Sequence, residues 1–303
     1  MKPFVLVTIT AVLLLITGCS PSSNDSGSTP SPSDSASEFA QTKQTAEVHR
    51  VISTTVAITE IMDALDMELV GIPTSAKKLP IRYAEVTEVG SPMSPDMEVV
   101  KMLKPTEILS VTTLESDLKP SFESAGIQAT FLDLTSLDKM KKVITELGSK
   151  YDRADQAAAL VKKFDDKVAD IKQRTANVEK PKVLILLGVP GSYLVATEHS
   201  YIGDLVKLVG GVNIVQGESV EYLASNTEYL QQGNPDVILR ASHGMPDEVI
   251  KMFDLEFKRN DIWKHFDAVS NDRVYDLPEE LFGTTGALNV DESLEALVGM
   301  LYP

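Results

Sequence analysis

Apolar residues recur at intervals of three and four in the middle of the chain. Between Tyr151 and Pro181, Asp, Lys, Gln and Arg fill most of the positions that separate them. This spacing predicts one long amphipathic helix over 151–181. Segments of similar length lie on each side, so we interpret the helix as the connection between two lobes. The alternative is one more surface helix within a single large domain. The apolar positions are Ala154, Ala157, Val161, Phe164, Val168 and Ile171.

The flanking segments alternate between predicted strands and predicted helices. The run Val183-Leu184-Ile185-Leu186-Leu187 is continuously apolar, which is typical of a strand covered on both faces. Shorter strands are predicted at 69–72, 108–111 and 237–239, and helices at 122–126, 137–147, 226–231, 247–253 and 290–301. The sequence therefore predicts an α/β protein with two Rossmann-like lobes, at 47–150 and 182–303, joined by the helix.

The first residues have the pattern of an export signal. Lys2 precedes an apolar run from Phe4 to Ile16, which is too short to span a bilayer comfortably. The ending Ile16-Thr17-Gly18-Cys19 resembles the bacterial lipobox, so we expect a signal peptide over 1–19 with lipidation at Cys19. A soluble export signal with a chance cysteine is the alternative. Residues 20–46 are Ser- and Pro-rich at their start and are interpreted as a flexible tether.

Charge and motif content exclude several functions. The formal net charge is −16 and the pI is about 4.7, which argues against a nucleic-acid partner because phosphate contacts need clustered Lys and Arg. The single cysteine excludes an internal disulfide and a Cys-based zinc site. Gly-x-Ser-x-Gly and His-Glu-x-x-His are absent. We therefore expect a binding protein, with a surface enzyme as the competing class.

Three features are candidates for a ligand site. Ser53-Thr54-Thr55 supplies cap residues for a helix, and the free N–H groups of a helix start suit an anion. Met93 stands between two prolines in a predicted loop, although methionine more often fills a core. His243 follows a predicted strand, where open α/β sheets hold ligands, although a lone histidine is more often structural or merely exposed.

A repeated signature links the two halves. Glu98 and Glu228 each begin a stretch of Glu, six residues, Pro, two residues and Ile-Leu. A glutamate in the first turn of a helix suits the helix dipole, which is sufficient explanation for either stretch alone. The same spacing in both halves indicates two lobes of related build.

Together these features resemble the helical-backbone class of substrate-binding lipoproteins that serve ABC importers of siderophores, cobalamin and haem. The chain is most similar to the haem receptor lipoproteins of the iron-regulated surface determinant system of Gram-positive bacteria. The resemblance covers nearly all of the chain after the tether. The segments that carry it are Thr54-Thr55-Val56-Ala57, Pro73-Thr74-Ser75, Pro92-Met93, 188–197, Asn226-Thr227-Glu228, His243-Gly244-Met245-Pro246 and 260–266.

The resemblance implies a function and a set of site residues. It implies a non-enzymatic protein that captures haem b with its iron and delivers it to an ABC permease, with cell-wall haem-donor proteins as further partners. It places the chain on the extracellular face of a Gram-positive cell membrane, held by lipid on Cys19. A ferric siderophore or another iron chelate is the alternative ligand. The implied residues are Met93 and His243 as axial ligands of the haem iron, Thr55, Val56, Ala57, Ser75 and Lys77 at the haem propionates and pocket, and Glu98 and Glu228 at the permease.

One position departs from the family pattern. Ala76 stands where the family carries an aromatic residue beside the haem. The departure puts a stacking contact in doubt but leaves the axial pair untouched.

Overall fold

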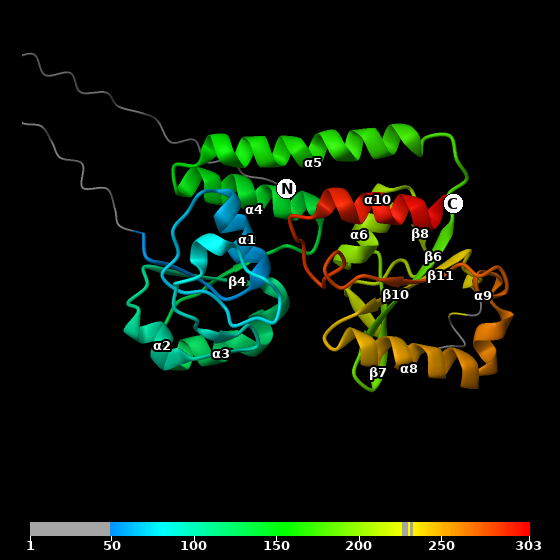
Figure 1. Cartoon of the computed structure of the whole chain (residues 1–303), viewed down its shortest axis with the longest axis horizontal. Helices are drawn as coiled ribbons and strands as arrows, with labels where there is room; N and C mark the ends of the chain where they lie inside the picture. The colour runs from blue at the N-terminus through cyan, green and yellow to red at the C-terminus, as the bar shows by residue number, and fades with distance from the viewer. Residues whose placement is uncertain (1–48, 226–229, 231–232) are drawn as a thin grey trace, which may run out of the picture. The chain divides into compact units, whose positions relative to one another are not determined.

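The computed structural model describes residues 49–225, 230 and 233–303. Its first sheet has three parallel strands in the order β1-β4-β5. Ile52 pairs with Ile108, and Ser110 pairs with Phe131. We call this sheet and its helices the first lobe (Figure 1). Its elements are β1 (Val51–Ser53), α1 (Val56–Ala64), η1 (Ile81–Tyr83), β2 (Gly90–Ser91), β3 (Ser94–Pro95), α2 (Met97–Met102), β4 (Glu107–Val111), η2 (Thr112–Leu114), α3 (Glu115–Ser124), β5 (Thr130–Leu132) and α4 (Leu137–Lys150).

The second sheet has six strands around a fully apolar centre. β6 (Lys182–Val189) pairs in parallel with β8 and β10 and antiparallel with β7, in the order β11-β10-β6-β7-β9. Val183 to Leu186 are completely buried, as the continuous apolar run predicted. We call this sheet and its helices the second lobe. Its other elements are β7 (Ser192–Ala196), α6 (Tyr201–Leu208), β8 (Val212–Asn213), β9 (Tyr222–Ala224), β10 (Val237–Ser242), α8 (Pro246–Arg259), η3 (Asp261–His265), α9 (Asp267–Ser270), β11 (Val274–Leu277) and α10 (Val290–Leu301).

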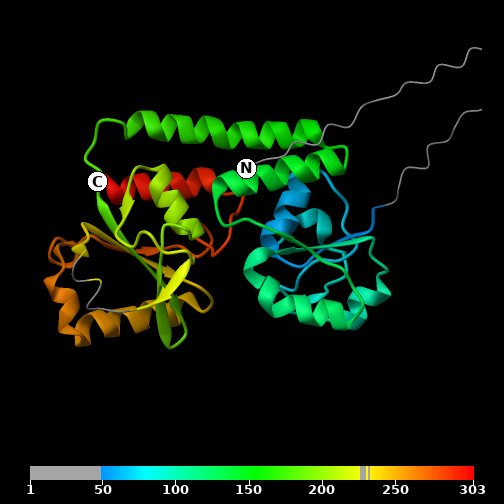
Figure 2. The same ribbon diagram turned by 180° about the vertical axis from the view of Figure 1, so that it is seen from behind.

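The long helix α5 (Ala154–Arg174) connects the two lobes. Ala157, Phe164 and Ile171 form its buried stripe, seven residues apart in each case. It is shorter at both ends than the predicted 151–181. Tyr151 caps the preceding helix α4 instead, and Asp152 has a left-handed backbone that ends one helix before the next begins. The two views show α5 running alongside α4 and α10 (Figure 1, Figure 2).

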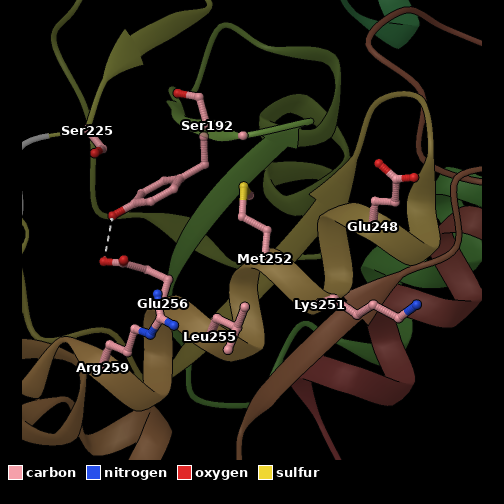
Figure 3. Close-up of a pocket in the computed structure, with 10 residues that line it drawn as sticks. Ser192, Ser225, Glu248, Lys251, Met252, Leu255, Glu256 and Arg259 are labelled. Carbon is pink, nitrogen blue, oxygen red and sulfur yellow. Dashed lines mark hydrogen bonds between the residues drawn. The ribbon is translucent and has the colours of Figure 1, made fainter.

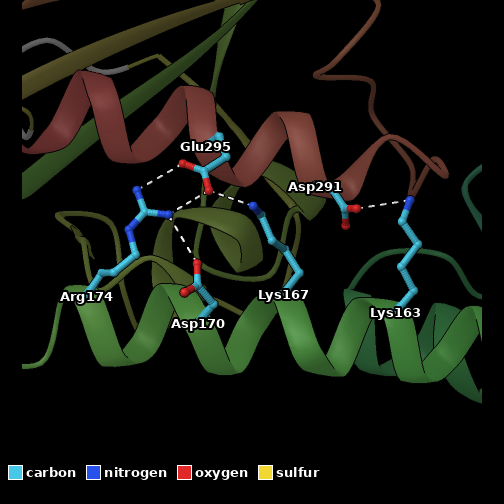
Figure 4. A network of polar contacts seen from close by, with 6 residues as sticks. All are labelled: Lys163, Lys167, Asp170, Arg174, Asp291 and Glu295. Atoms are coloured by element: carbon cyan, nitrogen blue, oxygen red, sulfur yellow. Dashed lines mark hydrogen bonds and ion pairs between the residues drawn. The ribbon is translucent and has the colours of Figure 1, made fainter.

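Ion pairs tie α5 to both lobes. Lys141 of α4 pairs with Asp165 at 2.7 Å. On the other side, Glu295 of α10 lies between Arg174 and Lys167, each at 2.6 Å (Figure 4). Hydrogen bonds from these two cations lower the pKa of Glu295 to about 2. Because each pair remains partly exposed to water, we expect it to contribute little to stability on its own.

Several predictions at the element level differ from the structure. The segment 69–72 was predicted as a strand but makes only two isolated bridges, from Gly71 to Ile52 and from Ile72 to Glu88. The predicted loop 90–96 holds a short hairpin, β2–β3. The predicted helix 122–126 is the end of α3, and that at 247–253 is the first half of α8. Within the predicted helix 226–231, only residue 230 is described. Glu228 and the segment 1–46 lie outside the described residues. None of the described helices has the length and apolar character needed to cross a membrane.

Candidate functional site

A cavity of about 390 Å³ lies between the loops of the two lobes. The strands β1, β4, β10 and β11 all end beside it, at the edge of the sheets where α/β proteins bind ligands. Its volume falls within the range of ordinary small-molecule pockets. The residues that line it are Thr55, Val56, Ala57, Glu60, Ser75, Ala76, Lys77, Pro92, Met93, Val111, Thr113, Leu114, His243, Glu279, Glu280, Gly283, Thr284, Thr285, Ala287 and Asn289.

The start of α1 forms one wall of this interlobe pocket. Thr55 has an extended backbone, and its hydroxyl accepts the Ile58 N–H at 3.4 Å. The first hydrogen bond within the helix runs from the Thr59 N–H to the Thr55 carbonyl. The N–H groups of Val56 and Ala57 precede that bond and carry no helical partner. The pocket is therefore lined by a helix N-terminus that favours negative charge.

The loop after Pro73 brings a cation to the same pocket. The Lys77 N–H donates to the Ser75 hydroxyl at 3.0 Å, which forms a tight turn. The Lys77 ammonium donates to the Glu279 carbonyl of the second lobe at 3.3 Å. Lys77 is the one Lys or Arg among the described residues that line the pocket.

Met93 occupies the tip of the β2–β3 hairpin. Its side chain is 60% exposed, so it belongs to no core. The hairpin depends on Gly90, whose φ is +95° and whose missing Cβ would lie 2.9 Å from the Asp96 nitrogen. The proline-flanked loop thus presents a thioether to the pocket from the first lobe.

His243 reaches the pocket from the second lobe. Its N–H donates to the Gly188 carbonyl at 2.9 Å, which extends the pairing of β10 with β6 by one residue. Gly244 and Met245 both adopt left-handed backbones before α8 begins at Pro246. His243 is exposed. The structure therefore brings Met93 and His243, 150 positions apart in numbering, to one pocket.

The sequence reasoning missed the acidic wall. Glu60 lies one turn into α1, and Glu279 and Glu280 follow β11. Burial raises the pKa of Glu60, and the charge of Lys77 and the N–H of Leu288 act in the opposite direction. The rule that identified His243, position after a strand end, applies equally to β11 and would have identified Glu279.

Two other side chains that can bind iron, those of Tyr193 and His199, line different cavities. Tyr193, a possible substitute ligand, lines a separate cavity of about 550 Å³, where its hydroxyl donates to Glu256 at 3.4 Å. Among the described residues, that cavity is lined by Gly191, Ser225 and residues of β7 and α8, all in the second lobe (Figure 3). His199 lines a separate polar cavity of about 390 Å³ that is bounded by residues of both lobes. Neither of these side chains is among the described residues that line the interlobe pocket.

The remaining predicted residues either do not line the pocket or lie outside the residues that the structure describes. Glu98 is exposed in the first turn of α2, where Asp96 caps the helix by accepting the N–H groups of Glu98 and Val99. Glu228 and Cys19 lie outside the described residues. The position of His265 two residues after Trp263 predicts a packing role, but His265 is exposed whereas Trp263 is buried. Across the described part of the chain, no group of three His, Cys, Asp or Glu side chains is placed to hold a bare metal ion.

Comparison with known proteins gives a consistent result. The chain is 49% identical over 258 residues to the high-affinity heme uptake system protein IsdE of Staphylococcus aureus, across 84% of this chain and 87% of the relative. Among solved structures, it matches S. aureus IsdE complexed with heme with a TM-score of 0.82 at 49% identity, covering 84% of this chain and 99% of that one. An ABC transporter substrate-binding protein from Listeria monocytogenes EGD-e matches with a TM-score of 0.80 at 61% identity, covering 84% and 98%.

More distant structures share the fold alone. A periplasmic heme binding protein from Pseudomonas aeruginosa matches with a TM-score of 0.70 at 21% identity, covering 84% of this chain and 93% of that one. These matches confirm the predicted arrangement of two α/β lobes on one connecting helix, the class III substrate-binding fold. Residues 51–281 match the periplasmic binding protein family, whose members are substrate-binding transport proteins. The chain belongs to the periplasmic binding protein family, within the branch that contains the haem uptake protein IsdE.

Proposed function

We propose that this chain binds haem in the interlobe pocket and delivers it to an ABC permease. The observation that carries the proposal is the position of Met93 and His243, which line one pocket from opposite lobes. A flat ligand held between two lobes needs one contact from each side. A thioether sulfur and an imidazole nitrogen are both established axial ligands of haem iron.

The rest of the pocket suits the apolar ring of haem and its two carboxylates. Val56, Ala57, Pro92, Val111 and Leu114 provide an apolar lining for the ring. The start of α1 and Lys77 provide a place for the two carboxylates, through backbone N–H groups, the helix dipole and one ammonium. Ala76 adds only a methyl group beside the ring, so no aromatic side chain stacks from that position.

The acidic wall orients the ligand. Glu60, Glu279 and Glu280 line the same pocket and repel carboxylates. The carboxylates of haem are therefore directed to the free N–H groups at the start of α1 and to the ammonium of Lys77, which lies against the Glu279 carbonyl and offsets the negative charge there. The same acids disfavour a strongly anionic ferric siderophore, since the described lining offers a single cation against three carboxylates.

Haemin titration of single variants tests the axial pair. Imidazole binds ferric iron more strongly than thioether does, so His243→Ala is expected to lose most haem affinity. Met93→Ala is expected to retain haem with a shifted absorption spectrum as water enters the sixth position. Met245→Ala, an exposed methionine in the turn after His243, is the matched control. Wild-type spectra and wild-type rates of haem loss in both Met93→Ala and His243→Ala would contradict the assignment.

We further propose domain boundaries, an anchor and a docking surface. The boundaries are a signal peptide over 1–19, a tether over 20–46, lobes over 47–150 and 182–303, and a connection over 151–181.

A lipid on Cys19 would hold the protein on the outer face of the membrane, and stable anchoring needs more than one acyl chain. Cys19→Ala should release the protein from membranes. A variant that remains membrane-bound would contradict the anchor.

Glu98 and Glu228 are proposed to dock the permease, with cell-wall donors as the source of haem. Glu98 supports this by its exposed position at the start of α2. Two separated acidic contacts act together even though each exposed pair is weak. Reversal of both charges should reduce haem import and leave haemin binding unchanged. Normal import by the double variant would contradict the docking role.

A further inference from the structure

Two short contacts join the lobes beside the pocket. Both hold the segment between β5 and α4, residues 134–137 of the first lobe. The Leu137 N–H donates to Oδ2 of Asp204 on α6 at 2.8 Å. The Gly286 N–H donates to the Leu134 carbonyl at 2.7 Å. We call these two contacts the seam.

Asp204 caps a helix that belongs to the other lobe. The hydroxyl of Ser136 already accepts the Lys139 N–H at the start of α4, which leaves the Leu137 N–H without a helical partner. The Asp204 carboxylate accepts that N–H at the positive end of the α4 dipole. Burial raises the pKa of Asp204, and the Leu137 N–H opposes the shift. A charged hydrogen bond in this sheltered position is stronger than an exposed one.

Gly286 packs against the same segment with no spare room. A Cβ at this position would lie 2.8 Å from the Met140 sulfur and 3.2 Å from the Leu134 carbonyl oxygen. Thr284, Thr285 and Ala287, the neighbours of Gly286, line the interlobe pocket. Gly286 of the seam and one wall of the pocket therefore belong to the same short segment, so a shift of Gly286 moves that wall.

We propose that Asp204 is a positioning residue for ligand binding, which holds the first turn of α4 from the opposite lobe and so sets the separation of the two pocket walls. The inference rests on the proposed function. Asp204 does not line the interlobe pocket; it lines the polar cavity that His199 also lines. Its influence on the ligand is therefore exerted only through the placement of the lobes.

The experiment compares Asp204→Ala with Asp204→Asn in the full chain. Haem loss from the loaded protein to excess apomyoglobin is measured, together with amide hydrogen exchange at Leu137 in the haem-free protein. Loss of the charged hydrogen bond in Asp204→Ala should accelerate haem loss about tenfold and accelerate exchange at Leu137. Asp204→Asn retains an acceptor oxygen without the charge, so its rates of haem loss and of exchange at Leu137 should fall between those of Asp204→Ala and the wild type. The haem absorption spectrum should be unchanged in both, because no ligand to iron is altered.

Asp138→Ala is the matched control. Asp138 lies in the same first turn of α4, but its side chain is 89% exposed and pairs with Lys141. Wild-type haem loss in Asp204→Ala would overturn the positioning role, whether or not exchange at Leu137 increased. Unchanged exchange at Leu137 would show that the bond does not hold the turn, and would also overturn it.

A second variant covers the case in which Asp204→Ala fails to fold. Gly286→Ala inserts a methyl group into the seam and should also accelerate haem loss with an unchanged spectrum. A wild-type rate in that variant would overturn the link between the seam and the pocket. If the wild-type chain takes up no haemin, the proposed function fails and this role with it, whereas exchange at Leu137 still reports whether the seam exists.

Discussion

Arg240 is the charged side chain whose loss should cost the second lobe most. It lies on β10 and is 8% exposed. Its Nε and Nη2 atoms donate to the two carboxylate oxygens of Asp276 at 2.7 and 2.6 Å, and Nη1 donates to Asp254 at 3.0 Å. The guanidinium carbon also lies 5.5 and 5.3 Å from the ring centroids of Phe253 and Phe257. Arg240→Met removes all of these contacts while it retains an apolar stem.

The expected cost follows from the exposure of the partners. Removing one member of a buried ion pair costs about 3–5 kcal/mol when the other member stays buried. The Asp276 and Asp254 side chains are 35% and 62% exposed, so water can partly replace Arg240. We therefore expect a loss of about 2–3 kcal/mol in the free energy of unfolding. For a protein of this size that loss lowers the thermal midpoint by about 4–12 °C.

Urea unfolding followed by tryptophan fluorescence measures the loss. Trp263 is the single tryptophan of the chain, and it is buried and stacked on Phe257 close to Arg240. Arg174→Met is the control, because Arg174 makes comparable ion pairs on an exposed helix surface. Equal unfolding midpoints for the two variants would refute the reasoning. Arg240→Met combined with Asp276→Leu should recover much of the loss, since it leaves no unpaired carboxylate on β11.

Two further predictions concern the pocket. Lys77→Glu should weaken haemin binding about tenfold and reduce its salt dependence, whereas Lys78→Glu, outside the pocket lining, should change neither in a haemin titration. Burial raises the pKa of Glu60, so its stabilising contribution is present at low pH and is lost as pH rises through the raised pKa. Glu60→Gln should therefore raise the thermal midpoint at pH 7 and lose that advantage in acid. A lower midpoint for Glu60→Gln at both pH values would contradict the prediction.

Periodicity and local chemistry were sufficient to predict the two α/β lobes and the helix that connects them. The apolar run at 183–187 reflects a strand that is buried on both faces, and the stripe of Phe164 and Ile171 reflects a helix that is buried on one face. Each cause acts within one element, so the local sequence reveals it. Helix ends were harder to place. A single left-handed residue, Asp152, separates α4 from α5, and nothing in the spacing of apolar residues marks it.

The site was only partly predictable from sequence. Thr55, Met93 and His243 have distinctive chemistry or position and were candidates from the residues themselves, whereas Lys77 was a candidate only through the family resemblance. The opposite wall, residues 283–289, contains Gly, Thr, Ala, Leu and Asn with no periodic pattern. Its role depends on where the chain passes after β11, which is decided by packing against the first lobe. The seam at Asp204 depends on tertiary contact in the same way.

The position of the pocket wall also bears on how the protein is made. The wall that carries Glu279 meets Lys77 across 202 positions of the chain. Both sheets are complete at Leu277, yet one side of the pocket is still missing at that point. Contacts between distant parts of a chain form late in folding, because a long loop must close first. The missing pocket wall therefore forms only when the segment after Leu277 packs between the lobes, and a chain truncated just after Leu277 would lose both that wall and the buried helix α10.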